Sequence, residues 1–201
     1  MPQLKEKKEK KEEESSWLKS GGLFIWEVAK IVIISLAIIL PIRYFLIQPF
    51  YVKGASMEPT FYDHQYLLID EITYRFSDPQ RGDIVVFHYP KDTSQFFIKR
   101  IIGLPGETLE IKDNAVYIYN KKFSQGVKLR EDYLGQEVLT NGNMNVELGD
   151  KEYFLMGDNR PSSLDSRFFG VVARKYLVGR TWLRVWPFEQ FKQFGVPAYN
   201  F

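Results

Sequence analysis

The chain has 201 residues, 45% of them hydrophobic and 16% aromatic, which is enough for one folded domain with an appended segment. Its 27 basic and 25 acidic residues are interspersed and give a net charge of +2, so the chain lacks the basic stripe that nucleic-acid binding requires. The absence of cysteine excludes disulfides and thiol catalysis. His64 and His88 are too scattered for a metal site and are expected at the surface. We therefore expect no nucleic-acid partner and no metal site built on cysteine or histidine.

The first 47 residues change abruptly in composition. Residues 1–22 are dominated by Lys, Glu and Ser and cannot bury enough apolar surface to fold, so they are predicted to form a solvated, charged tail. Residues 23–47 are apolar, with an uncharged run from Ile31 to Ile42. As a helix, residues 24–47 would extend about 36 Å, enough to cross a hydrocarbon layer of about 30 Å.

Three interpretations of this apolar segment compete: a buried core helix, a cleaved signal peptide and a membrane anchor. Apolar side chains cover every face of the helix, which argues against an amphipathic core helix. Bulky residues at 48–52 replace the small residues of a cleavage site. We favour an uncleaved anchor. Lysines precede the apolar run while only Arg43 and Lys53 follow it closely, so we expect a single-pass protein of the cytoplasmic membrane with its N-terminus in the cytoplasm and the rest outside.

Residues 48–201 show no long amphipathic helical pattern. Short β-branched and aromatic runs recur between turn signals, and the expected strands are 66–70, 83–89, 96–103, 108–112, 115–119, 153–156, 169–172 and 176–185. Asp113 and Asn114 predict a tight hairpin turn, and residues 120–151 predict a peripheral excursion. The sequence therefore predicts a mainly β fold, with one N-terminal transmembrane helix followed by an extracytoplasmic antiparallel β-sheet domain.

Aromatic and basic residues alternate near the C-terminus. The aromatic members are Trp182, Trp186, Phe188, Phe191 and Phe194. They could belong to the core, but aromatics beside cations also suit the headgroup layer of a bilayer.

A lone serine follows the apolar segment in the run GASMEPT at residues 54–60. Gly54 permits a tight backbone path and Pro59 holds the chain extended, so the hydroxyl of Ser56 is expected on a loop outside the core. Serines in such settings usually occupy turns without a chemical role. The segment alone therefore does not indicate catalysis.

Lys99 lies inside an apolar strand pattern, on the same expected face as Phe97 and Ile101. Burial disfavours the charged ammonium and lowers the pKa of a lysine, which leaves a free amine able to take a proton from a serine hydroxyl. The alternative is an edge-strand lysine that reaches solvent, as its neighbour Arg100 is expected to do.

Four segments in order give a more specific signal. They read SMEPT at 56–60, RGDIVVF at 81–87, FIKRIIGLPGE at 97–107 and MGDNR at 156–160, the last followed by Ser163, Asp165, Ser166, Arg167 and Gly170. In this order and spacing the chain resembles bacterial type I signal peptidases, from the apolar segment to about residue 188. The resemblance implies a membrane-anchored serine endopeptidase that removes signal peptides from exported preproteins without metal or cofactor, with preprotein signal peptides and membrane lipid as its partners.

The resemblance also implies roles for particular residues. Ser56 would be the nucleophile and Lys99 the general base and acid, with Ser163 orienting the lysine and Asp165 and Arg167 forming a supporting salt bridge. Residues 81–87 would supply the strand that pairs with substrate. The expected substrate-binding residues are Phe50, Val52, Met57, Asp83, Val86 and Ile98.

The chain departs from some relatives at Gly54, where they carry a hydroxyl residue that donates to the oxyanion. The oxyanion hole is then expected to use the backbone N–H of Ser56, with a contribution from the backbone of Gly54. Two alternatives to this function remain: a Ser/Lys self-cleaving regulator, and an anchored β-domain that binds extended peptides without cutting them.

Overall fold

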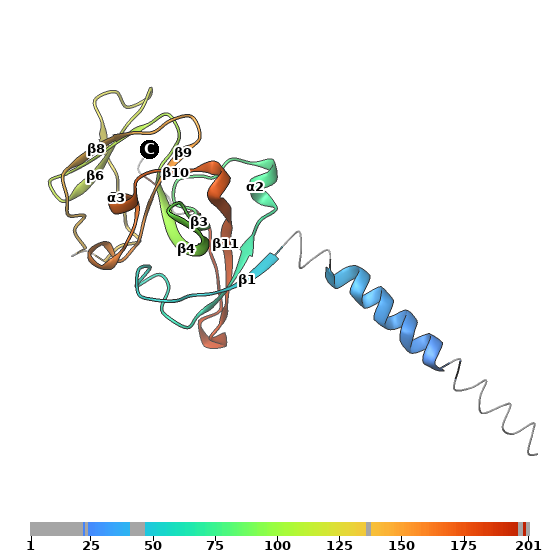
Figure 1. The fold of residues 1–201 in the computed structure, drawn as a ribbon. Helices are drawn as coiled ribbons and strands as arrows, with labels where there is room; N and C mark the ends of the chain where they lie inside the picture. Colours follow the sequence, from blue (N-terminus) through green and yellow to red (C-terminus); the bar gives the residue numbers. More distant parts are fainter. Residues whose placement is uncertain (1–21, 23, 41–46, 136–137, 197–198, 200–201) are drawn as a thin grey trace, which may run out of the picture. The chain divides into compact units, whose positions relative to one another are not determined.

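The computed structural model describes residues 22, 24–40, 47–135, 138–196 and 199. The chain divides into two compact units, Met1–Phe45 and Leu46–Phe201 (Figure 1). In the first unit, residues 24–40 form a helix. Most of the expected tail, and residues 23 and 41–46 of the expected anchor, lie outside the described residues.

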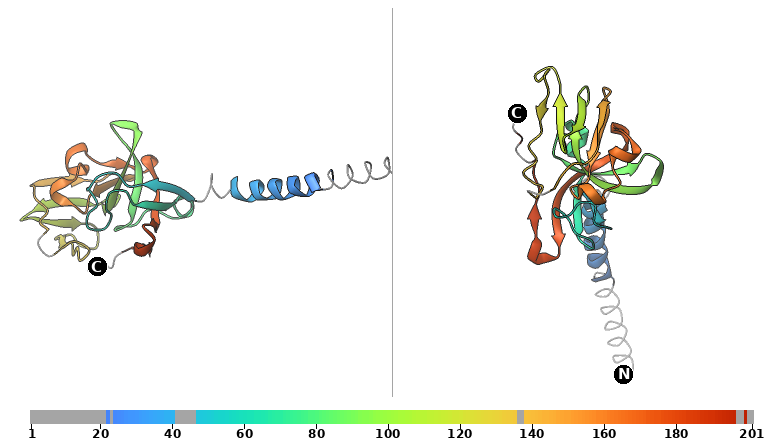
Figure 2. Two further views of the ribbon diagram at one scale, coloured as in Figure 1. Left: turned by 90° about the horizontal axis from the view of Figure 1, so that it is seen from below. Right: turned by 90° about the vertical axis from the view of Figure 1, so that its left-hand side faces the viewer.

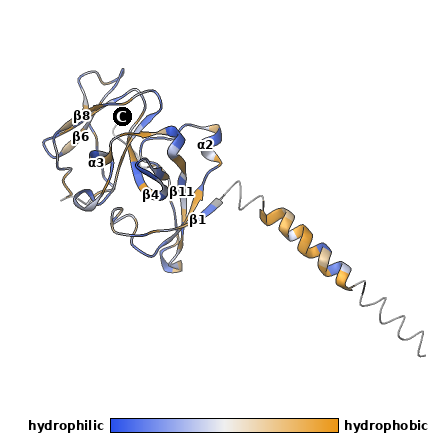
Figure 3. Ribbon diagram, in the orientation of Figure 1, coloured by the Kyte–Doolittle hydropathy of each residue, from blue (hydrophilic) through white to orange (hydrophobic). Residues whose placement is uncertain are grey.

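The helix over residues 24–40 is apolar along most of its length (Figure 3). Its large side chains are exposed on every face, with Ile31 at 65% and Ile38 at 57%. Among the described residues, however, no helix has both the length and the apolar character needed to cross a bilayer.

The second unit is built from antiparallel strands, as the sequence predicts. Its larger sheet has the order β1-β2-β11-β3-β4-β9-β10, with β12 paired to β11. These strands are β1 (Ile47–Tyr51), β2 (Tyr66–Asp70), β3 (Ile84–Tyr89), β4 (Asp92–Gly103), β9 (Glu152–Met156), β10 (Val172–Ala173), β11 (Leu177–Trp186) and β12 (Lys192–Gln193). The pairing register places β4 between β3 and β9. Figure 2 shows the strands of this unit from two further sides.

A smaller sheet has the order β7-β6-β5-β8. Its strands are β5 (Thr108–Lys112), β6 (Ala115–Tyr119), β7 (Val127–Lys128) and β8 (Met144–Glu147). β5 and β6 form the expected hairpin, and Asp113 and Asn114 at its turn have φ angles of 49° and 59°, which these residue types tolerate. Residues 120–151 were expected to be peripheral, but they supply β7 and β8 and bury Leu129 and Leu148.

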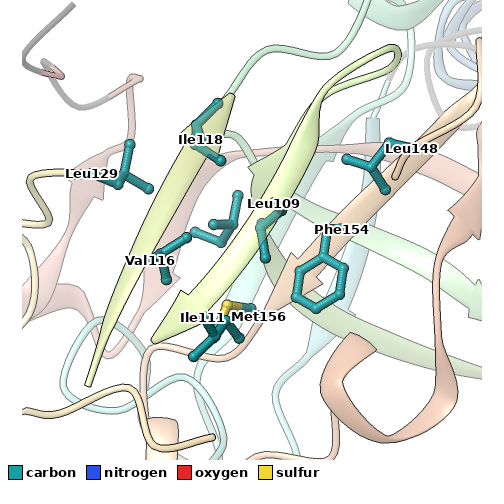
Figure 4. Close-up of a cluster of buried hydrophobic side chains, with 9 residues drawn as sticks. Leu109, Ile111, Val116, Ile118, Leu129, Leu148, Phe154 and Met156 are labelled. Carbon is teal, nitrogen blue, oxygen red and sulfur yellow. The ribbon is translucent and has the colours of Figure 1, made fainter. Parts of the chain in front are cut away.

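Alternation along β5 and β6 forms one core cluster. Leu109, Ile111, Val116 and Ile118 point from the small sheet toward Phe154 and Met156 of β9 (Figure 4). All six are fully buried, so this cluster joins the small sheet to the large one. Burial of apolar side chains on this scale is the main stabilising contribution to such a fold.

Short helices occupy the connections between strands. They are α2 (Thr73–Phe76), α3 (Ser166–Phe169) and the 3-10 turns η1 (Arg160–Ser162), η2 (Arg174–Tyr176) and η3 (Phe188–Gln190). The strand expected at 169–172 is wrong, because α3 ends at Phe169 and β10 begins only at Val172. Asp165 caps α3 by accepting from the Arg167 N–H, and Gly170 ends it with φ of 90°.

Candidate active site

Ser56 lies on a turn that leaves β1. Gly54 has φ of +88° and the Phe61 N–H donates to Met57 O over 2.9 Å, which closes the turn. Met57 is 1% exposed and Phe61 is fully buried, so two apolar side chains fasten the turn to the core. This leaves the half-buried side chain of Ser56 at the wall of a cleft.

Lys99 comes from β4 and is only 4% exposed. Its Nζ lies 2.8 Å from Ser56 Oγ and 2.9 Å from Ile98 O. The structure thus brings together the two residues expected to form the catalytic pair. It excludes the alternative in which Lys99 reaches solvent.

The electrostatics of Lys99 suit proton transfer. Burial lowers its pKa from 10.5 to about 8, against the opposing effect of the Asp165 and Asp158 carboxylates. The ammonium form donates to Ser56 Oγ, whereas the free amine can accept the proton of that hydroxyl. The free amine becomes the major form above pH 8.

Arg100 does not reach solvent, contrary to expectation, and is 3% exposed. Its guanidinium makes a bidentate pair with Asp158, with Nε to Oδ1 at 2.9 Å and Nη2 to Oδ2 at 2.6 Å. Thr60 Oγ1 donates to the same carboxylate over 2.6 Å. Burying this charge is tolerated because its partner is fully buried beside it. The pair fastens the Ser56 turn to the strand that carries Lys99.

The segment 157–159 holds the backbone of the nucleophile. Asn159 donates from its N–H to Ser56 O over 3.1 Å and from Nδ2 to Ala55 O over 3.0 Å. A Cβ on Gly157 would overlap Ser56 O and Ser163 Oγ, so only glycine permits this close approach. Sequence reasoning assigned no role to Asn159 or Gly157, although both lie in the segment MGDNR.

Of the three residues expected to support the catalytic pair, Asp165 and Arg167 make the expected contact and Ser163 does not. Asp165 and Arg167 form a bidentate pair at 2.9 and 2.8 Å, and Asp165 Oδ2 also accepts from the Gly157 N–H over 3.0 Å. Ser163 is 5% exposed, and its Oγ has no hydrogen-bond partner among the described residues. The expected hydrogen bond from Ser163 to Lys99 is therefore not formed in this structure.

One of the two expected oxyanion donors is available. The Ser56 N–H makes no hydrogen bond within the described part of the chain. The Gly54 N–H, in contrast, donates to Asp63 Oδ1 over 2.9 Å. The expected contribution from the Gly54 N–H is therefore wrong.

A cleft of about 650 Å³ opens beside Ser56 and Lys99. Four expected substrate-binding residues line it: Phe50, Val52, Val86 and Ile98. Leu164, which is 49% exposed, lies on its rim and was not expected there.

Met57 and Asp83 were also expected to bind substrate, but neither belongs to the described lining of the cleft. Met57 is buried in the core cluster beneath the turn. Asp83 accepts from the Tyr74 hydroxyl over 2.8 Å and from the Gln80 N–H over 2.9 Å. Both side chains therefore contribute to the fold and not to the described lining of the cleft.

Residues 81–87 were expected to supply the strand that pairs with substrate, but most of that strand is already paired within the sheet. β3 pairs with β11 on one edge and with β4 on the other, so residues 85–87 have no free edge. β4 pairs with β9 only from Arg100 onward. Among the described strands, none pairs with residues 94–98 of β4 on the edge opposite β3, and this open edge borders the cleft.

The described residues contain no cluster of three or more His, Asp or Glu side chains that could hold a metal ion. His64 is exposed, and the ring of His88 contacts Thr93 O at 2.8 Å. Neither histidine lies in the cleft lining described above.

Comparison with known proteins identifies the family to which the chain is related. A family model described as "Signal peptidase, peptidase S26" matches residues 25–186. Signal peptidase I of Bacillus amyloliquefaciens is 38% identical over 174 residues, covering 84% of this chain and 89% of that protein. Probable signal peptidase I-2 of Synechocystis is 35% identical over 186 residues, covering 90% and 78%.

A crystal structure of a signal peptidase I from Enterococcus faecalis is 35% identical and matches with a TM-score of 0.44, covering 52% of this chain and 97% of that one. The family match spans most of the chain, and it includes Ser56, Lys99 and the segment 156–170. On this match and the identities of the relatives, the chain belongs to the signal peptidase family, peptidase S26.

Proposed function

We propose that this peptidase is a membrane-anchored serine endopeptidase that cleaves N-terminal signal peptides from exported preproteins, with Ser56 as nucleophile and Lys99 as general base. The observation that carries the proposal is the 2.8 Å contact between Lys99 Nζ and Ser56 Oγ at the wall of the cleft. The substrate class follows from relatives that carry the name signal peptidase I.

The reaction can be written with this pair alone. The Lys99 amine takes the Ser56 proton as Oγ attacks the scissile carbonyl, and the Ser56 N–H donates to the oxyanion that develops. The Lys99 ammonium then gives its proton to the leaving amine, which departs as the new N-terminus. Water, deprotonated by Lys99, hydrolyses the acyl ester and restores Ser56. Asp165 and Arg167 would support this geometry by holding the loop at Gly157.

Substrate would bind as an extended strand along the open edge of β4, between residues 94–98 and the segment 50–56. Val52 and Val86, at 4% and 2% exposure, form a closed floor that suits small side chains before the scissile bond. Phe50 and Phe96, which both line the cleft, contact each other edge to face with ring centroids 5.4 Å apart.

The membrane part of the proposal rests on sequence. The apolar run 23–47 is long enough to span a bilayer, and the lysines before it place the N-terminus in the cytoplasm and the catalytic unit outside. Trp186, Phe188 and Phe191 are 48%, 71% and 60% exposed beside Arg184 and Lys192, which suits contact with lipid headgroups. Anchoring would raise the local concentration of substrates that span the same membrane.

The test is incubation of the detergent-solubilised full chain with a preprotein, beside Ser56→Ala. We expect one cut after a small residue with wild type and none with the variant. Binding without any cut by wild type would favour the peptide-binding alternative. Cleavage of the chain itself but not of the preprotein would favour the self-cleaving regulator.

A further inference from the structure

We propose that Glu131 is a positioning residue of the active site, acting through Arg160 from the segment between β7 and β8. The inference rests on the proposed function, because it assigns a role in the reaction of Ser56 and Lys99. We call the residues that surround the Arg160 guanidinium, namely Glu131, Tyr133 and Thr140, the clasp.

Arg160 is almost wholly enclosed, at 2% exposure. Its Nη1 donates to Glu131 Oε2 over 2.9 Å and to Thr140 Oγ1, and its Nη2 donates to Glu131 Oε1 and, over 3.3 Å, to the Tyr133 hydroxyl. Glu131 forms a bidentate ion pair with Arg160, with one carboxylate oxygen on each Nη atom. A buried arginine requires such a partner, so the position of Arg160 depends on Glu131.

Arg160 in turn holds the backbone beside the nucleophile. Its Nε donates to Gly157 O over 3.1 Å, and its carbonyl accepts from Arg167 Nη2 over 2.6 Å. Between these contacts lies Asn159, whose N–H donates to Ser56 O. Gly157 sits so close to Ser56 O that a Cβ would overlap it. A shift of Arg160 would therefore be passed to the Ser56 backbone through Gly157 and Asn159.

The clasp also reaches the strand of the general base. The Tyr133 ring lies 3.9 Å from Arg100 Cζ, and Arg100 follows Lys99 on β4. One segment outside the four sequence motifs thus contacts two arginines: Arg160, which holds the backbone next to Ser56, and Arg100, which follows Lys99. Because the Ser56 Oγ to Lys99 Nζ contact is made between two separate elements, its length depends on how both are held.

The experiment compares Glu131→Gln with Asp132→Asn in the full chain in detergent. Both changes remove one carboxylate charge, but Asp132 is an exposed neighbour that pairs with exposed Arg130. Cleavage of a peptide substrate gives kcat and KM, and amide hydrogen exchange reports on residues 56–61. We expect Glu131→Gln to lower kcat about ten-fold or more with KM unchanged, and to speed exchange at 56–61, while Asp132→Asn matches wild type.

The outcomes separate the two proposals. If wild type cleaves and Glu131→Gln cleaves as fast per folded molecule, the positioning role is overturned and the proposed function stands. A fall in kcat that only follows the folded fraction, measured by circular dichroism in the same sample, also overturns it. If wild type does not cleave, the proposed function fails, and unchanged exchange at 56–61 in Glu131→Gln would then overturn the positioning role as well.

Discussion

Burying Lys99 costs the fold stability at neutral pH, and Lys99→Met measures that cost. The pKa of Lys99 falls from 10.5 to about 8 in the folded chain, mainly through burial. Between these two values the unfolded state holds a proton that the folded state has released, so stability rises with pH across this window and the full cost applies below pH 8. A shift of this size corresponds to about 3 kcal/mol.

Met has nearly the length of Lys and no charge, so it removes this cost while filling the site between Phe97 and Ile101. The loss of the contacts from Nζ to Ile98 O and to Ser56 Oγ together offsets about 1 kcal/mol of the gain. We therefore expect Lys99→Met to be inactive but more stable than wild type at pH 7 by about 2 kcal/mol, or about 4 °C or more in Tm.

The assay is thermal unfolding of the full chain in detergent at pH 7 and pH 10. The advantage of Lys99→Met should be present at pH 7 and nearly absent at pH 10, where wild-type Lys99 is neutral in the fold. Lys112→Met is the matched control: Lys112 is partly exposed and its pKa is raised by Glu110, so its replacement should bring no such gain. The reasoning would be refuted if Lys99→Met were less stable than wild type at pH 7. It would also be refuted if the stability difference between the two proteins were the same at pH 7 and pH 10.

The remaining predictions concern rate, ion pairing and topology. kcat/KM should rise with pH through about 8 as the Lys99 amine loses its proton, and a flat profile from pH 6 to 9 would exclude an amine base. Asp158→Asn leaves Arg100 buried without a carboxylate and should lower the free energy of unfolding by about 3–5 kcal/mol in urea titrations; a loss below about 1 kcal/mol would mean that the pair behaves like a surface salt bridge. Protease added to intact spheroplasts should digest the chain from about residue 50 onward and spare the tail, whereas digestion of the tail alone would reverse the orientation.

Local pattern predicted most of the longer strands. The hairpin of 108–112 and 115–119 has the expected bounds, because alternation and turn chemistry both lie within a dozen residues. The predicted strand at 169–172 is wrong because the Asp165 side chain caps a helical turn there, a contact that outweighs the β propensity of Phe168 and Phe169. β7 and β8 were missed because each is too short to show a period.

The site was predictable only in part. Ser56 and Lys99 stand in recognisable segments, but the residues that hold them act across long separations in sequence. Arg100 looked solvent-facing beside Lys99, since its partner Asp158 lies 58 residues away. Glu131 carries no motif at all, and only the packed structure places it on Arg160. Strand pairing is likewise a tertiary property, so the open edge of β4 could not be distinguished from the closed edges of β3.

The central claim is that Ser56 and Lys99 act as one catalytic unit. The most direct measurement is kcat for preprotein cleavage in Ser56→Ala, in Lys99→Ala and in the double variant, all in the full chain. The account predicts that each single change reduces kcat to the same residual level and that the double change is no worse than either, because groups that act together are not additive. Appreciable turnover in Lys99→Ala, or a further loss in the double variant, would contradict it.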